Sequence, residues 1–156
     1  MLGVRMAGEV GLASIKGWLA VLVGVVGVLV PLGQVGSFLT LTNAAPILEP
    51  RFGSNWSTYF ALASSVMAAR TIICLFVAKS LIWDRRRSTP KIAAIGIWVA
   101  LFLLGVVSVA IAVAFNPGPV SYGRAAPNLI WLILISAAAT AYLLRSKRVA
   151  ATYSAP

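Results

Sequence analysis

Few side chains in this sequence can do chemistry. The 156 residues contain no histidine, one cysteine and three acidic residues. The acids Glu9, Glu49 and Asp84 are expected to lie outside the apolar parts of the chain. Serines occur within those parts, at Ser64, Ser65, Ser108 and Ser136. A serine nucleophile needs a base, and neither a histidine nor a clearly placed lysine accompanies these serines. We therefore expect no catalytic site, no metal site and no cofactor, and predict that the protein is not an enzyme.

The residues also give little support to a proton-coupled transporter or to a lipid-modifying enzyme. A proton-coupled transporter normally needs a carboxylate or histidine at membrane depth, which this chain does not offer. A lipid-modifying enzyme could use Asp84 beside the neighbouring arginines, but a lone carboxylate in a basic turn is usually only a helix-end charge, since it has no partner with which to form a nucleophile-and-base pair.

Arg70 is the side chain whose position most needs an explanation. It lies about midway between Trp56 and Trp83, which puts it near the centre of a bilayer, where a charge costs about 2.5–3.5 kcal/mol. It could be stabilised by backbone carbonyls, by Ser108 or Thr140, by a lipid headgroup reached by snorkelling, or by the carboxylate of another protein. The last case would make Arg70 a determinant of assembly, whereas a thinned bilayer or a helix register shifted by one turn would leave it without a function.

A second group of basic residues gathers at the ends of apolar segments, on one side of the expected membrane. We expect it to contact anionic lipid at the cytoplasmic face, at about 1 kcal/mol per residue, although basic residues there also serve to orient the chain. The group consists of Arg85, Arg86, Arg87, Lys91, Arg145, Lys147 and Arg148.

The elements that must position these residues are apolar helices. The chain is 60% hydrophobic and 10% charged, with a mean hydropathy of +0.95, and its apolar blocks reach the roughly 20 residues needed to cross a bilayer. We predict an all-α, polytopic integral membrane protein, a single membrane domain over 1–156 with four transmembrane helices in an up-down bundle. The predicted helices are 18–41, 57–83, 91–115 and 125–144.

Helix-breaking residues separate these blocks. We expect irregular external loops at 43–55 and 116–124, a basic turn after Trp83, and a short mobile tail after Arg148. Small residues are expected to allow close helix contacts, with Gly96 and Gly105 among them. Similar positions are Gly24, Gly27, Gly33 and Gly36 around Pro31, and Ser136 to Thr140.

Orientation follows from the basic residues. On one side lie Arg5, Lys16 and the seven residues of the basic group, whereas Arg51 and Arg124 lie on the other. Basic loops stay in the cytoplasm, so both termini are expected there. A cleavable signal ending near Ala44 is the competing interpretation, but the first apolar block is much longer than the roughly 7–15 residues of a signal core.

Particular residues also suggest a family. They are Gly17, Trp18, Leu19, Pro31, Leu41, Thr42, Trp56, Pro90 and the ending from Tyr142 to Tyr153. In these the chain resembles the YdgK-like family of bacterial inner-membrane proteins, a domain-of-unknown-function family of four-helix chains. The resemblance implies a bacterial inner membrane and supplies no activity. The chain departs from the family in its second helix, where Ser64, Ser65 and Arg70 stand in the region of a family glutamate.

Two functions remain open from the sequence. The first is an accessory or assembly subunit of a larger membrane complex, which acts through intramembrane helix contacts with other subunits or with itself. The alternative is a small oligomeric transporter or lipid-binding protein in which Arg70 contacts an anionic ligand. Neither interpretation involves nucleic acid.

Overall fold

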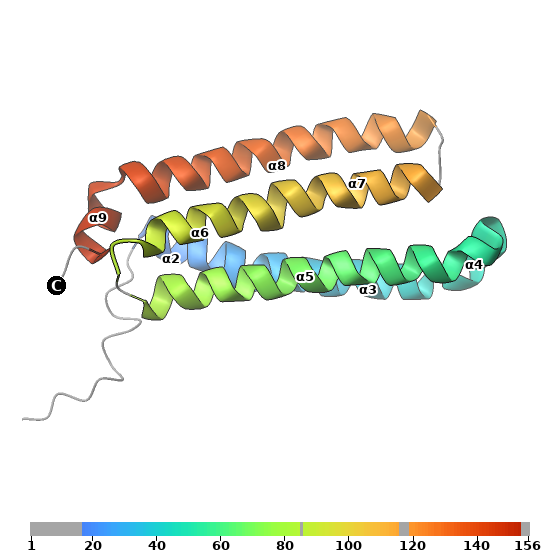
Figure 1. Ribbon diagram of the computed structural model, residues 1–156, viewed down its shortest axis with the longest axis horizontal. Coiled ribbons are helices and arrows are strands. Elements are labelled where there is room, and N and C mark those ends of the chain that lie inside the picture. The colour runs from blue at the N-terminus through green and yellow to red at the C-terminus, as the bar shows by residue number, and fades with distance from the viewer. Residues whose placement is uncertain (1–16, 85, 116–118, 154–156) are drawn as a thin grey trace, which may run out of the picture.

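The computed structural model describes residues 17–84, 86–115 and 119–153, with side chains omitted for 119–126. All regular secondary structure in these ranges is helical. Four segments are long and apolar enough to span a membrane, and they run back and forth along one another (Figure 1). The spans are Trp18–Asn43, Ala45–Trp83, Thr89–Phe115 and Pro127–Arg145. The predicted all-α membrane bundle is therefore confirmed.

The first span is not a uniform α-helix. It consists of α2 (Trp18–Gly24), the π-helix η1 (Val25–Leu29) and α3 (Val30–Asn43). Pro31 lies in the first turn of α3 and has no N–H to donate to the preceding turn. The wider π turn ends at Leu29, just before this proline. The missing N–H of Pro31 interrupts the regular α-helical hydrogen bonds at this point in any case.

The residues between α3 and the long helix of the second span are helical, so the predicted irregular loop at 43–55 is wrong. It forms α4 (Ala45–Phe52) and the 3₁₀ turn η2 (Gly53–Asn55) before α5 (Trp56–Trp83) begins. Pro46 lies in the first turn of α4, a position that suits proline. Gly53, with a φ of 55°, ends the helix in a conformation that glycine adopts easily. These residues reverse the chain through helical turns (Figure 1).

The third and fourth spans pack side by side (Figure 1). The third consists of α6 (Thr89–Ile97), the π-helix η3 (Trp98–Leu103) and α7 (Leu104–Phe115). The fourth is the part of α8 (Pro119–Arg145) from Pro127 onward. The predicted external loop at 116–124 is therefore wrong from residue 119 onward, where the chain is helical. Pro119 begins α8, because a proline is well suited to a first helical turn. The remainder of that loop, 116–118, lies outside the described residues.

The C-terminal segment folds back onto the bundle, which contradicts the expected mobile tail. Lys147–Tyr153 forms α9, and its Val149 and Tyr153 side chains are buried. The Tyr153 hydroxyl donates a hydrogen bond to the carbonyl oxygen of Leu81, 2.6 Å away. Leu81 lies in the last turn of α5, where carbonyls lack donors within the helix. Tyr153 thus caps α5 from the far end of the chain.

The buried core concentrates where α5, α6, α8 and α9 meet. It includes Leu81, Ile97, Ala139, Leu143 and Val149. By contrast, α3 contains no buried residue. Arg5, Glu9, Lys16 and Arg85, which entered the sequence argument, lie outside the described residues.

Glycines set the closest approach between spans. A Cβ atom placed on Gly96 would overlap Cγ2 of Val77, and one on Gly27 would lie 2.7 Å from Cβ of Ala78. As predicted for Gly96, helices α5 and α6 pack at a distance that excludes a larger side chain. Gly24, by comparison, has no atom within 4 Å of such a Cβ position.

This contrast gives a stability prediction. Gly96→Ala is expected to lower the free energy of unfolding by about 1–3 kcal/mol, because it overpacks the α5–α6 contact. Gly24→Ala, the matched control, is expected to be neutral or to stabilise by up to about 1 kcal/mol through helix propensity. Unfolding by sodium dodecyl sulfate titration in micelles measures both, and equal effects would contradict the packing described.

The capping role of Tyr153 gives a second prediction. Tyr153→Phe keeps the buried ring but removes the donor to the Leu81 carbonyl, and is expected to cost about 1 kcal/mol of stability. Hydrogen exchange should also become faster at the C-terminal turn of α5 and in α9. Unchanged exchange at both places would show that this bond does not hold α9 against the bundle.

Candidate functional site

Arg70 reaches across the bundle to another span. It lies on α5, and its Nε donates a hydrogen bond to the carbonyl oxygen of Ala100, 2.9 Å away. Ala100 is part of the π-helix η3. A π turn shifts backbone bonds from the fourth to the fifth residue back, so the carbonyl pattern of an α-helix is broken there. The guanidinium brings an additional donor to this turn.

The bond to Ala100 decides among the ways in which Arg70 could be stabilised. A backbone carbonyl of the chain itself is used. The two side chains that sequence reasoning considered are engaged elsewhere: the Ser108 hydroxyl donates to the Leu104 carbonyl at 2.7 Å, and Thr140 Oγ1 accepts from the Trp98 indole N–H at 2.9 Å. Arg70 therefore points into its own bundle.

One nitrogen of Arg70 remains without a partner among the described residues. Its Nη2 is buried and makes no hydrogen bond there. A Cβ on Gly105 would lie 2.7 Å from Cδ1 of Leu132 and 3.5 Å from Nη2, so the small size of Gly105 lets Leu132 of α8 pack closely beside the guanidinium. A guanidinium only donates hydrogen bonds. The centre can hold helices together or bind an acceptor, but it cannot act as a base.

Three further buried side-chain atoms in the described part of the chain lack a hydrogen-bond partner. These atoms belong to the hydroxyls of Ser64, Thr89 and Ser136. Within the same ranges no group of three or more His, Cys, Asp or Glu side chains could hold a metal ion. Cys74, the single cysteine, is a buried free thiol.

The residues predicted to contact lipid differ in their surroundings. Arg86, Arg87, Lys91, Arg145, Lys147 and Arg148 are all exposed at one end of the bundle, which we call the basic end, while Arg85 lies outside the described residues. Arg86 pairs with Asp84 at 3.5 Å. Arg87 and Lys91, in contrast, line a common cavity.

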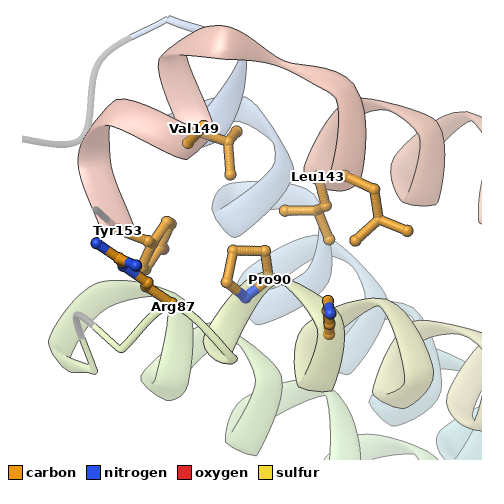
Figure 2. Close-up of a pocket in the computed structure, with 8 residues that line it drawn as sticks. Arg87, Pro90, Leu143, Val149 and Tyr153 are labelled. Carbon is orange, nitrogen blue, oxygen red and sulfur yellow. The ribbon is translucent and has the colours of Figure 1, made fainter.

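This cavity, of about 250 Å³, is built by four segments of the basic end. Figure 2 shows Arg87 from the turn and Pro90 from α6 below Leu143 of α8 and Val149 of α9, with Tyr153 beside Arg87. Sequence reasoning missed the α9 wall. The spacing of Val149 and Tyr153, four residues apart, could have shown it, since such residues share one face of a helix.

A second, apolar groove of about 420 Å³ continues from the first cavity. The two share Lys91 and Leu144. The groove runs between the third span and α8 along Ala94, Ile95, Trp98, Val99, Phe102, Leu103 and Thr140. Because Trp98 and Thr140 hydrogen-bond to each other, their polar groups are satisfied and the groove offers mainly hydrocarbon.

A further groove, of about 550 Å³, runs along α3. The larger side chains that line it are Leu41, Leu48 of α4 and Met67 of α5. The rest of the lining consists of small residues, which are Gly33, Gly36, Ser37, Thr40 and Ala44. Nothing lies within 4 Å of a Cβ placed on Gly33 or Gly36. The hydroxyls of Ser37 and Thr40 donate back to the Gly33 and Gly36 carbonyls at 2.9 Å. The groove is therefore open and lined by small side chains, and its Ser37 and Thr40 hydroxyls already have hydrogen-bond acceptors.

The comparison with protein families covers nearly the whole chain. Residues 12–154 match a family described as protein of unknown function (DUF2569). The chain belongs to the DUF2569 family. The match includes all four spans and α9 of this DUF2569 chain, so an uncharacterised family is confirmed. The narrower YdgK-like resemblance, with its bacterial inner membrane, remains a prediction. No curated protein and no solved structure matches the chain.

The internal bond of Arg70 gives a third prediction. Arg70→Leu leaves the Ala100 carbonyl without this donor and is expected to lower stability by about 1 kcal/mol. Arg70→Gln keeps a donor and is expected to lose less than Arg70→Leu. Lys79→Leu, which removes an exposed cation from the same helix, should change stability by less than about 0.5 kcal/mol. Unfolding in micelles compares the three, and an Arg70→Leu variant as stable as the wild type would contradict a structural role.

Proposed function

We propose that this DUF2569 chain is a non-enzymatic accessory or assembly subunit of a larger membrane complex. In this proposal, the groove along α3 binds a transmembrane helix of a partner subunit. The basic end faces the cytoplasm of a bacterial inner membrane, in accordance with the distribution of basic residues. The observation that carries the proposal is the open stripe of small residues on a helix with no buried residue.

Small residues have a specific use between membrane helices. Lipid tails are as apolar as leucine, so helices associate through close packing, and small residues let two backbones approach. Gly27 and Gly96 already serve contacts within this chain, because a Cβ on either would meet α5. Gly33 and Gly36 serve no such contact among the described residues. Their open groove fits the backbone of a further helix.

The contacts of Arg70 give little support to this side chain as the contact with a partner. Its Nε bonds to Ala100 and its Nη2 is buried, so a partner's carboxylate has little access to that nitrogen. Arg70 also lines neither the α3 groove nor the cavities at the basic end. For the same reason the geometry gives less support to a transporter that binds an anionic ligand at Arg70.

Site-specific photo-crosslinking in the native membrane tests the proposal. A photoreactive residue at Ser37, on the α3 groove, is expected to give one discrete adduct with another membrane protein. The same residue at Val35, which lines a different groove between α3 and α5, should give little. Gly36→Leu should reduce the Ser37 adduct roughly tenfold by filling the groove. Gly24→Leu makes the same change on the same span at another open site and should leave the adduct unchanged.

Three outcomes would overturn the proposal. An adduct of twice the mass of the chain would show that a second copy occupies the groove. Equal adducts from Ser37 and Val35 would show contact without selectivity. Adducts with lipid alone would show that α3 faces the bilayer. Circular dichroism and gel filtration of the purified variants establish that Gly36→Leu and Gly24→Leu remain folded.

A further inference from the structure

We propose that the basic end binds one anionic phospholipid of the surrounding bilayer. The phosphate lies between Arg87 and Lys91 in the cavity that α9 closes, and an acyl chain lies in the apolar groove between the third span and α8. This inference uses neither the α3 groove nor a partner subunit, so it stands or falls independently of the proposed function.

The headgroup part of the site is a cavity with a fixed wall. Arg87 comes from the turn after α5, Lys91 from the first turns of α6, and α9 contributes the opposite side (Figure 2). The Tyr153 hydroxyl bond to Leu81 fixes α9 in that position. Two cations on a built cavity at the end of the spans match a phosphodiester at headgroup depth. Arg86, by comparison, already has Asp84 as a partner.

The acyl part of the site begins where the headgroup part ends. Lys91 and Leu144 line both cavities, so the charged and apolar parts are continuous. Lys91 and Leu103, at the two ends of the groove, are separated along the helix by about 18 Å at about 1.5 Å per residue. That length is a little more than half of a hydrocarbon core of about 30 Å, the depth that one leaflet's acyl chain occupies.

The continuity of the two parts favours a lipid over a soluble phosphate. A free phosphate or phosphate ester would use Arg87 and Lys91 and leave the groove empty. Ile95, Val99 and Phe102 lie in that groove, whose one internal polar pair, Trp98 with Thr140, is self-satisfied. An apolar channel that opens onto two cations is complementary to an amphiphile with an anionic head.

Native mass spectrometry of the full chain released from nanodiscs tests this inference. The nanodiscs contain phosphatidylglycerol and phosphatidylcholine in equal amounts. The wild type is expected to retain one phosphatidylglycerol selectively. Arg87→Gln with Lys91→Gln should reduce its retention at least tenfold, since both direct charge-assisted contacts of the cavity with the phosphate are lost. The control, Arg145→Gln with Lys147→Gln, removes the same charge from the same end outside the cavity and should reduce retention less than twofold.

A groove variant separates a lipid from a soluble phosphate. Ile95 is 65% exposed, so Ile95→Trp can fold while it obstructs the groove and keeps both cations; it should lower phosphatidylglycerol retention severalfold. Glycerol phosphate added in excess should not displace the lipid. Equal losses in the two charge-removal variants would show a diffuse basic surface. Unchanged retention in Ile95→Trp, with displacement by glycerol phosphate, would show a soluble-phosphate site. Either result overturns the inference.

Discussion

Hydrocarbon offers no hydrogen bonds, and the structure of this chain depends on that constraint. Each backbone polar group within a span must find its partner inside the protein, which leaves helices as the elements available to the four apolar segments. Several polar side chains follow the same rule, whereas Ser64 and Ser136 have no partner among the described residues. The hydroxyls of Ser37, Thr71 and Ser108 bond to carbonyls four residues earlier in their own helices. Where helices meet, Arg70 bonds to Ala100 and Trp98 to Thr140.

These internal bonds leave the bundle with two unlike surfaces. The basic end is tightly built, because α9 packs against α6 and α8, bonds to Leu81 of α5 and closes one side of the cavity that Arg87 and Lys91 line. The first span packs against α5 along its length, but its second half, α3, has no buried residue. The proposed lipid would occupy the first surface and the proposed partner helix the second. Because the two surfaces are separate, both could be occupied at the same time.

The number of spans and their helical structure, which the bilayer imposes, could be predicted from the sequence. Block length and composition predicted four spans, and the small size of Gly96 predicted a close helix contact. The breaker residues at 43–55 were misread because Pro46 and Gly53 interrupt a helix without excluding a short one. The burial of Tyr153 depends on a bond to Leu81, 72 residues away, and Arg70 bonds to a carbonyl 30 residues away. Such tertiary partners leave no periodic pattern in one sequence, so neither bond could be assigned from the sequence.

The proposed function requires the open face of α3 to be a docking site for another transmembrane helix. Electron cryomicroscopy of the complex, isolated in nanodiscs directly from the native membrane, can show what lies on that face. Helical density from another subunit is expected in the groove along Gly33, Gly36, Ser37 and Thr40, close enough for backbones to touch. Density for ordered lipid or a second copy of the chain in that groove, with any partner bound elsewhere, would contradict it.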